Sequence, residues 1–107
     1  MRRVEWSPQA QSDLIDACDW YEEHRSGLGG ELRETLGRYT ELLREFPESH
    51  PVVFTRVRRA SLGRFPWSVH YLVESDRILV VALFHHSRHP RQWRGRVQER
   101  APEFAAA

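Results

Sequence analysis

The densest hydrophobic pattern in the chain predicts a β-hairpin. Residues 67–73 alternate between apolar and polar positions, which indicates a strand with one solvent-exposed face. Four polar residues, 74–77, separate this strand from seven consecutive apolar residues, 78–84. An unbroken apolar run of this length is typical of a strand that is covered on both faces. We therefore expect residues 78–84 to form the central strand of a sheet.

Two earlier segments carry apolar residues at helical spacing. The first begins at Ser7 and Pro8, where serine caps the helix and proline occupies its first position. The second repeats apolar residues at steps of four and three from residue 32 to residue 46, and Pro47 ends it. The glycine-rich residues 26–30 link the two. Together they predict a helical hairpin whose apolar faces cover a sheet.

The remaining segments complete an α+β fold. Residues 4–6 read as a short strand beside the central one, and residues 48–53 as a loop. A further strand begins near position 54 or 56 and ends at 62. The predicted order is β-α-α-β-β-β, with the helical hairpin packed on one face of a small, mostly antiparallel sheet. We expect a single domain over residues 1–100 and a disordered tail over residues 101–107.

Charge is distributed unevenly along the chain. Residues 1–50 contain 6 arginines against 11 acidic residues, whereas residues 51–100 contain 10 arginines against 3 acidic residues. All sixteen basic residues are arginine. Since arginine binds phosphate and carboxylate groups bidentately and stacks on bases, the second half predicts an anionic partner, either a nucleic acid or an acidic protein.

Basic and aromatic residues of this half form the candidate binding set, because this combination suits phosphates and stacked bases. Its members are Arg58, Arg59, Arg64, Trp67, His86, Arg88 and Trp93. For phosphodiester cleavage, the candidate catalytic residues are Arg56, Arg58, His86 and Arg88. A slip of one residue in strand register would exchange the faces of Arg58 and Arg59, so the sequence leaves their faces open.

Several other residues are of types that can bind metals or take part in catalysis, but their sequence context argues against such roles. His85, His86 and His89 are close in sequence, but adjacent strand residues point to opposite faces and nearby arginines repel a cation. We therefore expect no metal and no cofactor. Tyr71 alternates with valines and is expected in the core, and the single cysteine, Cys18, is expected to be a buried structural thiol. With no signal peptide or membrane span in the sequence, we expect a cytoplasmic protein.

Four segments resemble the RelE/ParE superfamily of bacterial type II toxin–antitoxin toxins. They are residues 4–10, 45–47, 64–71 and 85–93, and the last is the most specific. The resemblance covers about residues 3–94. It is closer to the ParE-like, plasmid-stabilisation branch than to the branch of ribosome-dependent nucleases.

The resemblance implies a toxin that inhibits DNA gyrase by binding and is neutralised by a cognate antitoxin, in a possible hetero-oligomer. Ser68 replaces a strand arginine of the nuclease branch, and Trp93 lies where that branch has a tyrosine. Since tryptophan can stack on a base but cannot transfer a proton, both departures favour binding over catalysis. Cleavage of ribosome-bound mRNA remains the alternative, and an inactive interaction module is a further one.

Overall fold

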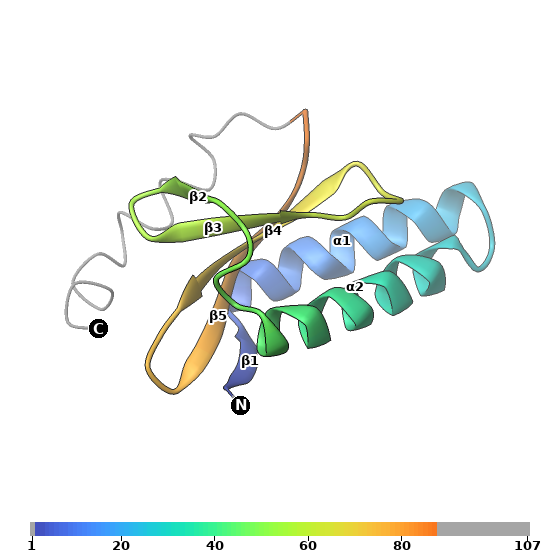
Figure 1. Cartoon of the computed structure of the whole chain (residues 1–107). Helices are drawn as coiled ribbons and strands as arrows, with labels where there is room; N and C mark the ends of the chain where they lie inside the picture. The colour runs from blue at the N-terminus through green and yellow to red at the C-terminus, as the bar shows by residue number, and fades with distance from the viewer. Residues whose placement is uncertain (1, 88–107) are drawn as a thin grey trace.

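The computed structural model describes residues 2–87, and it places two helices on one face of a five-stranded sheet (Figure 1). The elements are β1 (Arg3–Trp6), α1 (Pro8–His24), α2 (Leu28–Glu45), β2 (Val52–Phe54), β3 (Val57–Ser61), β4 (Trp67–Val73) and β5 (Arg77–His85). The strand order is β1-β5-β4-β3-β2, in which β1 runs parallel to β5 and the other pairs are antiparallel. The predicted α+β class, with a helical hairpin on a mostly antiparallel sheet, is confirmed.

The two helices begin in different ways. At the start of α1 the Ser7 hydroxyl accepts a hydrogen bond from the Ala10 backbone nitrogen at 3.1 Å, as the sequence predicted. The cap of α2 is Gly27, which has a φ of 88° and no side chain to offer. Instead the Glu22 carboxylate of α1 accepts hydrogen bonds from the backbone nitrogens of Gly27 and Gly29, at 2.8 and 3.0 Å. The first helix therefore caps the second.

The sheet contains one strand more than the hydrophobic pattern predicted. Residues 52–54, expected to belong mostly to a loop, form β2 and pair with β3. A tight turn joins the two strands, and Thr55 adopts a left-handed conformation in it, with a φ of 49°. Three residues are too few to display a period, so only pairing with β3 identifies this strand.

The prediction that β4 has one exposed face is wrong. Ser68 and His70 are as buried as Val69 and Tyr71, with exposed fractions of 1%, 3%, 0% and 0%. The alternation of polar and apolar residues therefore marks two different buried faces. The strand over 78–84 is interior and buried throughout, as predicted, but it lies between β1 and β4, and β4 takes the middle position.

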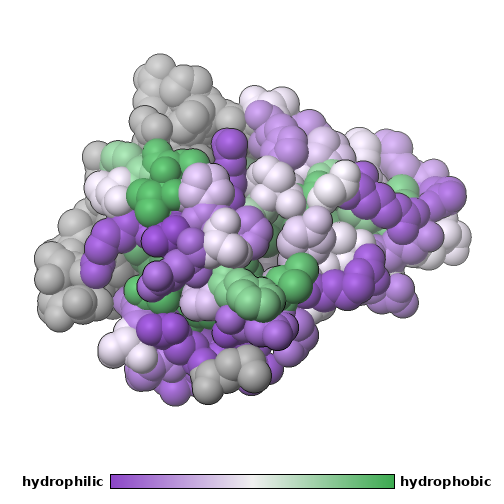
Figure 2. Space-filling view, viewed as in Figure 1, coloured by the Kyte–Doolittle hydropathy of each residue, from purple (hydrophilic) through white to green (hydrophobic). Residues whose placement is uncertain are grey.

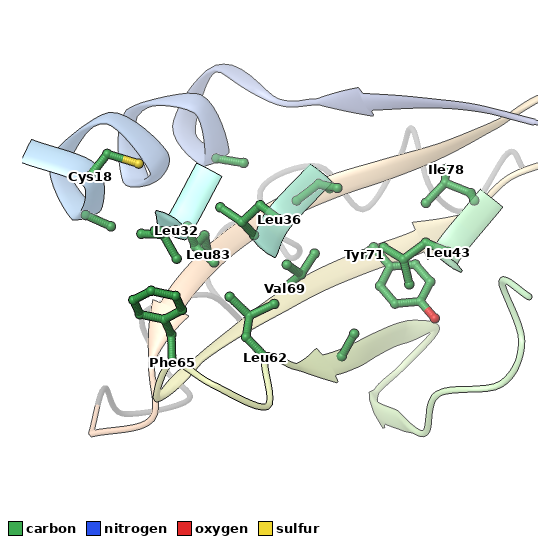
Figure 3. Packing of buried hydrophobic residues seen from close by; sticks show 14 of the residues in the cluster. Cys18, Leu32, Leu36, Leu43, Leu62, Phe65, Val69, Tyr71, Ile78 and Leu83 are labelled. Atoms are coloured by element: carbon green, nitrogen blue, oxygen red, sulfur yellow. The ribbon is translucent and has the colours of Figure 1, made fainter. Parts of the chain in front are cut away.

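The main core lies between the helices and the sheet (Figure 3). Tyr71 and Cys18 belong to it, as predicted, together with Leu36 of α2 and Leu83 of β5. A second apolar cluster, to which neither helix contributes, lies on the opposite face of the sheet. Its buried members are Val57, Leu72, Leu79, Val81, Ala82 and Phe84.

A bulge in β5 explains how two neighbours reach the same cluster. The pairing with β4 steps from His70–Ala82 to Tyr71–Val80, which leaves Val81 as an extra residue. Val81 and Ala82 consequently both face away from the helices.

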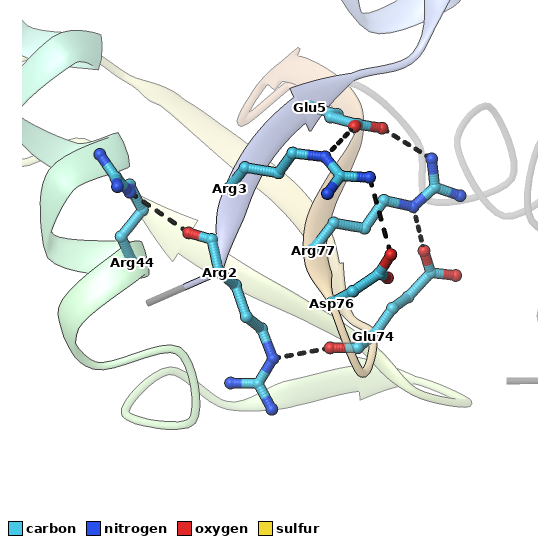
Figure 4. A network of polar contacts seen from close by, with 7 residues as sticks. All are labelled: Arg2, Arg3, Glu5, Arg44, Glu74, Asp76 and Arg77. Carbon is cyan, nitrogen blue, oxygen red and sulfur yellow. Dashed lines mark hydrogen bonds and ion pairs between the residues drawn. The ribbon is translucent and has the colours of Figure 1, made fainter.

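An ion-pair network fastens β1 to the turn between β4 and β5 (Figure 4). Arg77 lies between the carboxylates of Glu5 and Glu74, and its distance to Glu5 is 2.7 Å. The Arg2 guanidinium donates to the Glu74 backbone carbonyl at 2.7 Å. Residues more than seventy positions apart are thereby held at one end of the sheet.

Candidate functional site

Two members of the predicted binding set, Arg59 and His86, lie on the same face of the sheet, opposite the helices. Arg59 pairs with His70 of β4, and Ser61 pairs with Ser68, so these side chains share one face. Ser68 also lies opposite Phe84, which places His86, two residues further, on the same side. We refer to Arg59, Ser61, Ser68 and His86 as the corner site.

A chain of hydrogen bonds links three residues of the corner site. The hydroxyl oxygens of Ser61 and Ser68 are 3.2 Å apart, and the Ser68 oxygen is 2.8 Å from Nε2 of His86. Ser68 is 1% exposed, whereas Ser61 and His86 are exposed. The backbone nitrogen of His86 donates to the Pro66 carbonyl at 2.9 Å, which fixes the start of the segment after β5. The imidazole is therefore held on a buried hydroxyl.

The chemistry open to the corner site is mainly polar binding. The Arg59 guanidinium is exposed and forms no ion pair with the described residues, 2–87. Together with the Ser61 hydroxyl it offers donors to a carboxylate, a carbonyl or a phosphate oxygen. His86 is the group of this site whose ring nitrogens can donate or accept a proton, and its Nε2 already interacts with Ser68.

Arg58 lies on the helix side of the sheet, opposite Tyr71, so the register resolves the question that the sequence left open. Its Nη1 donates to the backbone carbonyls of Glu48 and His50, at 3.1 and 2.7 Å. These contacts hold the loop between α2 and β2 against β3.

Beside Arg58, the hydroxyl of Tyr71 donates to the Pro47 carbonyl at 2.7 Å. Burial raises the pKa of Tyr71 to about 12, and burial also lowers the pKa of His50. Both effects favour the neutral form of the side chain. The neutral phenol is thereby favoured under the loop, and the neutral imidazole is favoured within the loop itself.

Arg64 and Trp67 also lie on the helix side, at the turn between β3 and β4. The Trp67 indole nitrogen donates to the Tyr21 hydroxyl at 2.9 Å, and its ring meets His85 edge-on, with centroids 5.4 Å apart. Arg64 forms an ion pair with Glu31 at 3.2 Å and lies over the Phe65 ring. These contacts tie both residues to the helices rather than to the corner site.

The other candidates are dispersed. Arg56 is exposed in the turn between β2 and β3. Arg88 and Trp93 lie outside the described residues, as does His89. The binding set is thus divided between two sides of the sheet, and Arg58 and His86 of the catalytic set lie on opposite faces.

Sequence reasoning missed Ser61 and noted Ser68 only as the replacement of an arginine. The signal that identifies them is their pairing across β3 and β4, which a known register would have provided. The described residues contain no group of three or more histidine, cysteine, aspartate or glutamate side chains that could hold a metal ion. In that part of the chain, no helix has the length and apolar character to cross a bilayer.

Comparison with known proteins identifies the family. The model of the ParE toxin of the type II toxin–antitoxin system, parDE, matches residues 4–90. A solved structure described as a chromosomal ParDE TA system from P. aeruginosa superposes with a TM-score of 0.60. The match covers 79% of this chain and 96% of that chain at 19% identity, which shows a shared fold. No curated protein sequence matches the chain. The chain therefore belongs to the ParE toxin family of type II toxin–antitoxin systems.

Proposed function

We propose that this toxin arrests growth by binding DNA gyrase in the cytoplasm and that a cognate antitoxin neutralises it. The observation that carries the proposal is the match of the ParE toxin model to residues 4–90, which include both helices and all five strands except Arg3, the first residue of β1. The similar structure from P. aeruginosa is described as part of a ParDE system, and this supports an antitoxin partner.

The corner site supports action by binding rather than by RNA cleavage. Cleavage that uses the 2′-hydroxyl requires a base, a cation for the developing negative charge and an acid for the leaving oxygen. Arg59 can supply the cation, but a guanidinium is a poor proton shuttle because it has donors and no acceptor. Both proton-transfer steps would therefore depend on His86, whose Nε2 is 2.8 Å from the Ser68 hydroxyl. One imidazole that already interacts with a serine is a sparse proton-transfer apparatus, which favours binding.

The proposal is tested by producing the toxin without its partner and assaying two activities in parallel. We expect the purified chain to inhibit gyrase-catalysed supercoiling of relaxed plasmid and to leave ribosome-bound mRNA intact. Codon-specific cleavage of that mRNA by the wild-type chain would contradict the proposal and favour the nuclease alternative. In that case His86→Ala should abolish cleavage and leave antitoxin binding largely intact.

Growth measurements separate an active toxin from an inactive interaction module. Induction of the chain alone should arrest growth, and co-expression with the product of the neighbouring reading frame should restore it. A chain that is harmless when induced alone, yet still binds that product, would support the interaction module instead.

A further inference from the structure

A groove runs along α2 on the helix side of the molecule, where β1 and the first turns of α1 meet that helix. It consists of two adjoining hollows of about 370 and 210 Å³, and Trp6 and Thr40 line both of them. The larger is also lined by Arg3, Val4, Glu41 and Arg44, and the smaller by Leu14, Arg33, Leu36 and Gly37. We call this surface the Trp6 groove.

The Trp6 groove offers an apolar floor and an open helix backbone. Trp6 and Leu14 are half-buried and pack against the main core, so their outer surfaces remain accessible. Gly37 is exposed, and a Cβ added there would meet nothing within 4 Å. The missing side chain leaves room for another chain to approach α2.

Elsewhere in residues 2–87 the large exposed apolar residues are scattered. Ile15 and Trp20 are on α1, Leu42 is on α2, Phe46 directly follows α2, and Val52 begins β2. In the view of Figure 2, hydrophilic residues cover most of the surface and the apolar areas are small and separate. Single apolar residues of this kind are ordinary for a protein surface, whereas a groove that combines an apolar floor with charged edges indicates a specific contact.

The charge of the Trp6 groove differs from that of its surroundings. Residues 8–45 carry nine acidic residues and four arginines, yet the groove is lined by three arginines and one glutamate. Arg44 bonds Glu41 and the Arg2 carbonyl, and Arg3 pairs with Glu5. Arg33 is exposed and makes no hydrogen bond or ion pair within residues 2–87. A neighbouring hollow on α2, of about 690 Å³, is lined by three glutamates and one arginine, so the positive charge is local.

We propose that the Trp6 groove binds an acidic segment of the antitoxin that places an apolar side chain against Trp6 and a carboxylate beside Arg33. This inference rests on the proposed function, because it names the surface by which the toxin holds its antitoxin. Acidic segments with a few apolar anchors are typical of chains that fold on binding. The groove lies on the helix side of the sheet and the corner site on the opposite face, so the anchor does not occupy the corner site.

Two substitutions test the groove, and each has a matched control on the same helix. Gly37→Leu fills the groove, whereas Gly30→Leu adds the same side chain at an exposed position that is also open and lies outside it. Arg33→Glu reverses the charge at the groove, and Arg38→Glu does so at a position that does not line it. All four sites are exposed, and circular dichroism verifies that each variant is folded.

The readout is the Kd for the purified product of the neighbouring reading frame, measured by titration calorimetry. We expect Gly37→Leu and Arg33→Glu to raise the Kd about tenfold or more, which corresponds to about 1.4 kcal/mol per factor of ten. The two controls should bind like the wild type. In cells, the groove variants should arrest growth even when the antitoxin is co-expressed.

The outcomes separate this inference from the proposed function. If both groove variants bind the antitoxin as tightly as their controls, the groove is not the docking site, although antitoxin binding itself stands. If the wild-type chain fails to bind the neighbouring product, the proposed antitoxin partnership fails, and the groove assignment fails with it.

Discussion

At the scale of single residues, Gly29 marks the closest approach of the two helices. A Cβ at this position would lie 2.6 Å from the Cys18 backbone carbonyl oxygen and 3.0 Å from the Glu22 carboxylate. Because the first of these atoms belongs to the backbone of α1, the helices would have to move apart to accommodate it. A Cβ added at Gly30, the second glycine of the pair, would meet nothing within 4 Å. Two adjacent glycines thus serve different purposes.

This contrast predicts opposite effects of the same substitution. Gly29→Ala should lower the free energy of unfolding by about 1–3 kcal/mol, the usual range for overpacking a filled interior. Gly30→Ala should raise it by up to about 1 kcal/mol, because alanine is the better helix former. Urea denaturation of both variants measures the difference. Equal effects at the two positions would show that the helices do not approach closely at Gly29.

A second prediction concerns Tyr71, whose phenol is fully buried and has its pKa raised from 10.0 to about 12. Between these values the unfolded chain loses the proton and the folded protein keeps it. The stabilisation from neutral Tyr71 is therefore complete below pH 10 and is lost as the pH rises towards 12, by roughly 2 kcal/mol.

Urea unfolding at about pH 9 and about pH 12 measures this loss. Tyr71→Phe should show a shallower decline, since phenylalanine has no proton to lose. Tyr39→Phe is the matched control, because the Tyr39 hydroxyl binds the Gly63 backbone nitrogen at a more exposed place and should leave the decline unchanged. The same decline in wild type and Tyr71→Phe would exclude Tyr71 as its source.

At the scale of elements, the helical hairpin depends on a contact between its two members. The Glu22 carboxylate accepts the backbone hydrogen bonds of Gly27 and Gly29 at the start of α2, where a capping side chain is missing. A carboxylate at this end also interacts favourably with the helix dipole.

Glu22→Ala should therefore destabilise the protein by about 1 kcal/mol, the typical value for loss of a helix cap. Glu23→Ala, the neighbouring substitution, removes an exposed carboxylate that takes no part in this cap and should change stability by less than about 0.5 kcal/mol. Thermal unfolding followed by circular dichroism at 222 nm compares the two variants. A loss of equal size in both would mean that the carboxylate of Glu22 does not act as a cap.

At the scale of the whole molecule, the sheet separates two surfaces with different proposed roles. The corner site faces away from the helices and the Trp6 groove lies on the helix side. If the corner site contacts the target and the groove holds the antitoxin, substitutions on the two surfaces should affect different activities.

Arg59→Ala should weaken inhibition of gyrase, because it removes the exposed cation of the corner site, and leave the Kd for the antitoxin within about twofold of wild type. Arg38→Ala, which removes an exposed arginine from α2 on the helix side, is the matched control for inhibition. Supercoiling assays and titration calorimetry on the same preparations provide both readouts. Loss of antitoxin binding in Arg59→Ala would contradict the separation of the two surfaces.

Much of this architecture follows from the sequence alone. The sequence correctly predicted the two amphipathic helices, the Ser7 cap, the strand over 78–84 and the burial of Tyr71. Each of these features depends on local periodicity or on a few neighbouring residues. The segments that resemble the RelE/ParE superfamily likewise identified the family that the comparison establishes.

Only the tertiary structure decided which residues share a face. β2 could be identified only from its pairing with β3. The second face of β4 is buried, and Arg58 and Arg59 lie on opposite sides of the sheet. The link from Ser61 through Ser68 to His86 likewise depends on how three strands align. The physical reason is that side chains alternate along a strand, so a shift of one residue reverses every face, and the alignment is set by contacts between segments far apart in sequence.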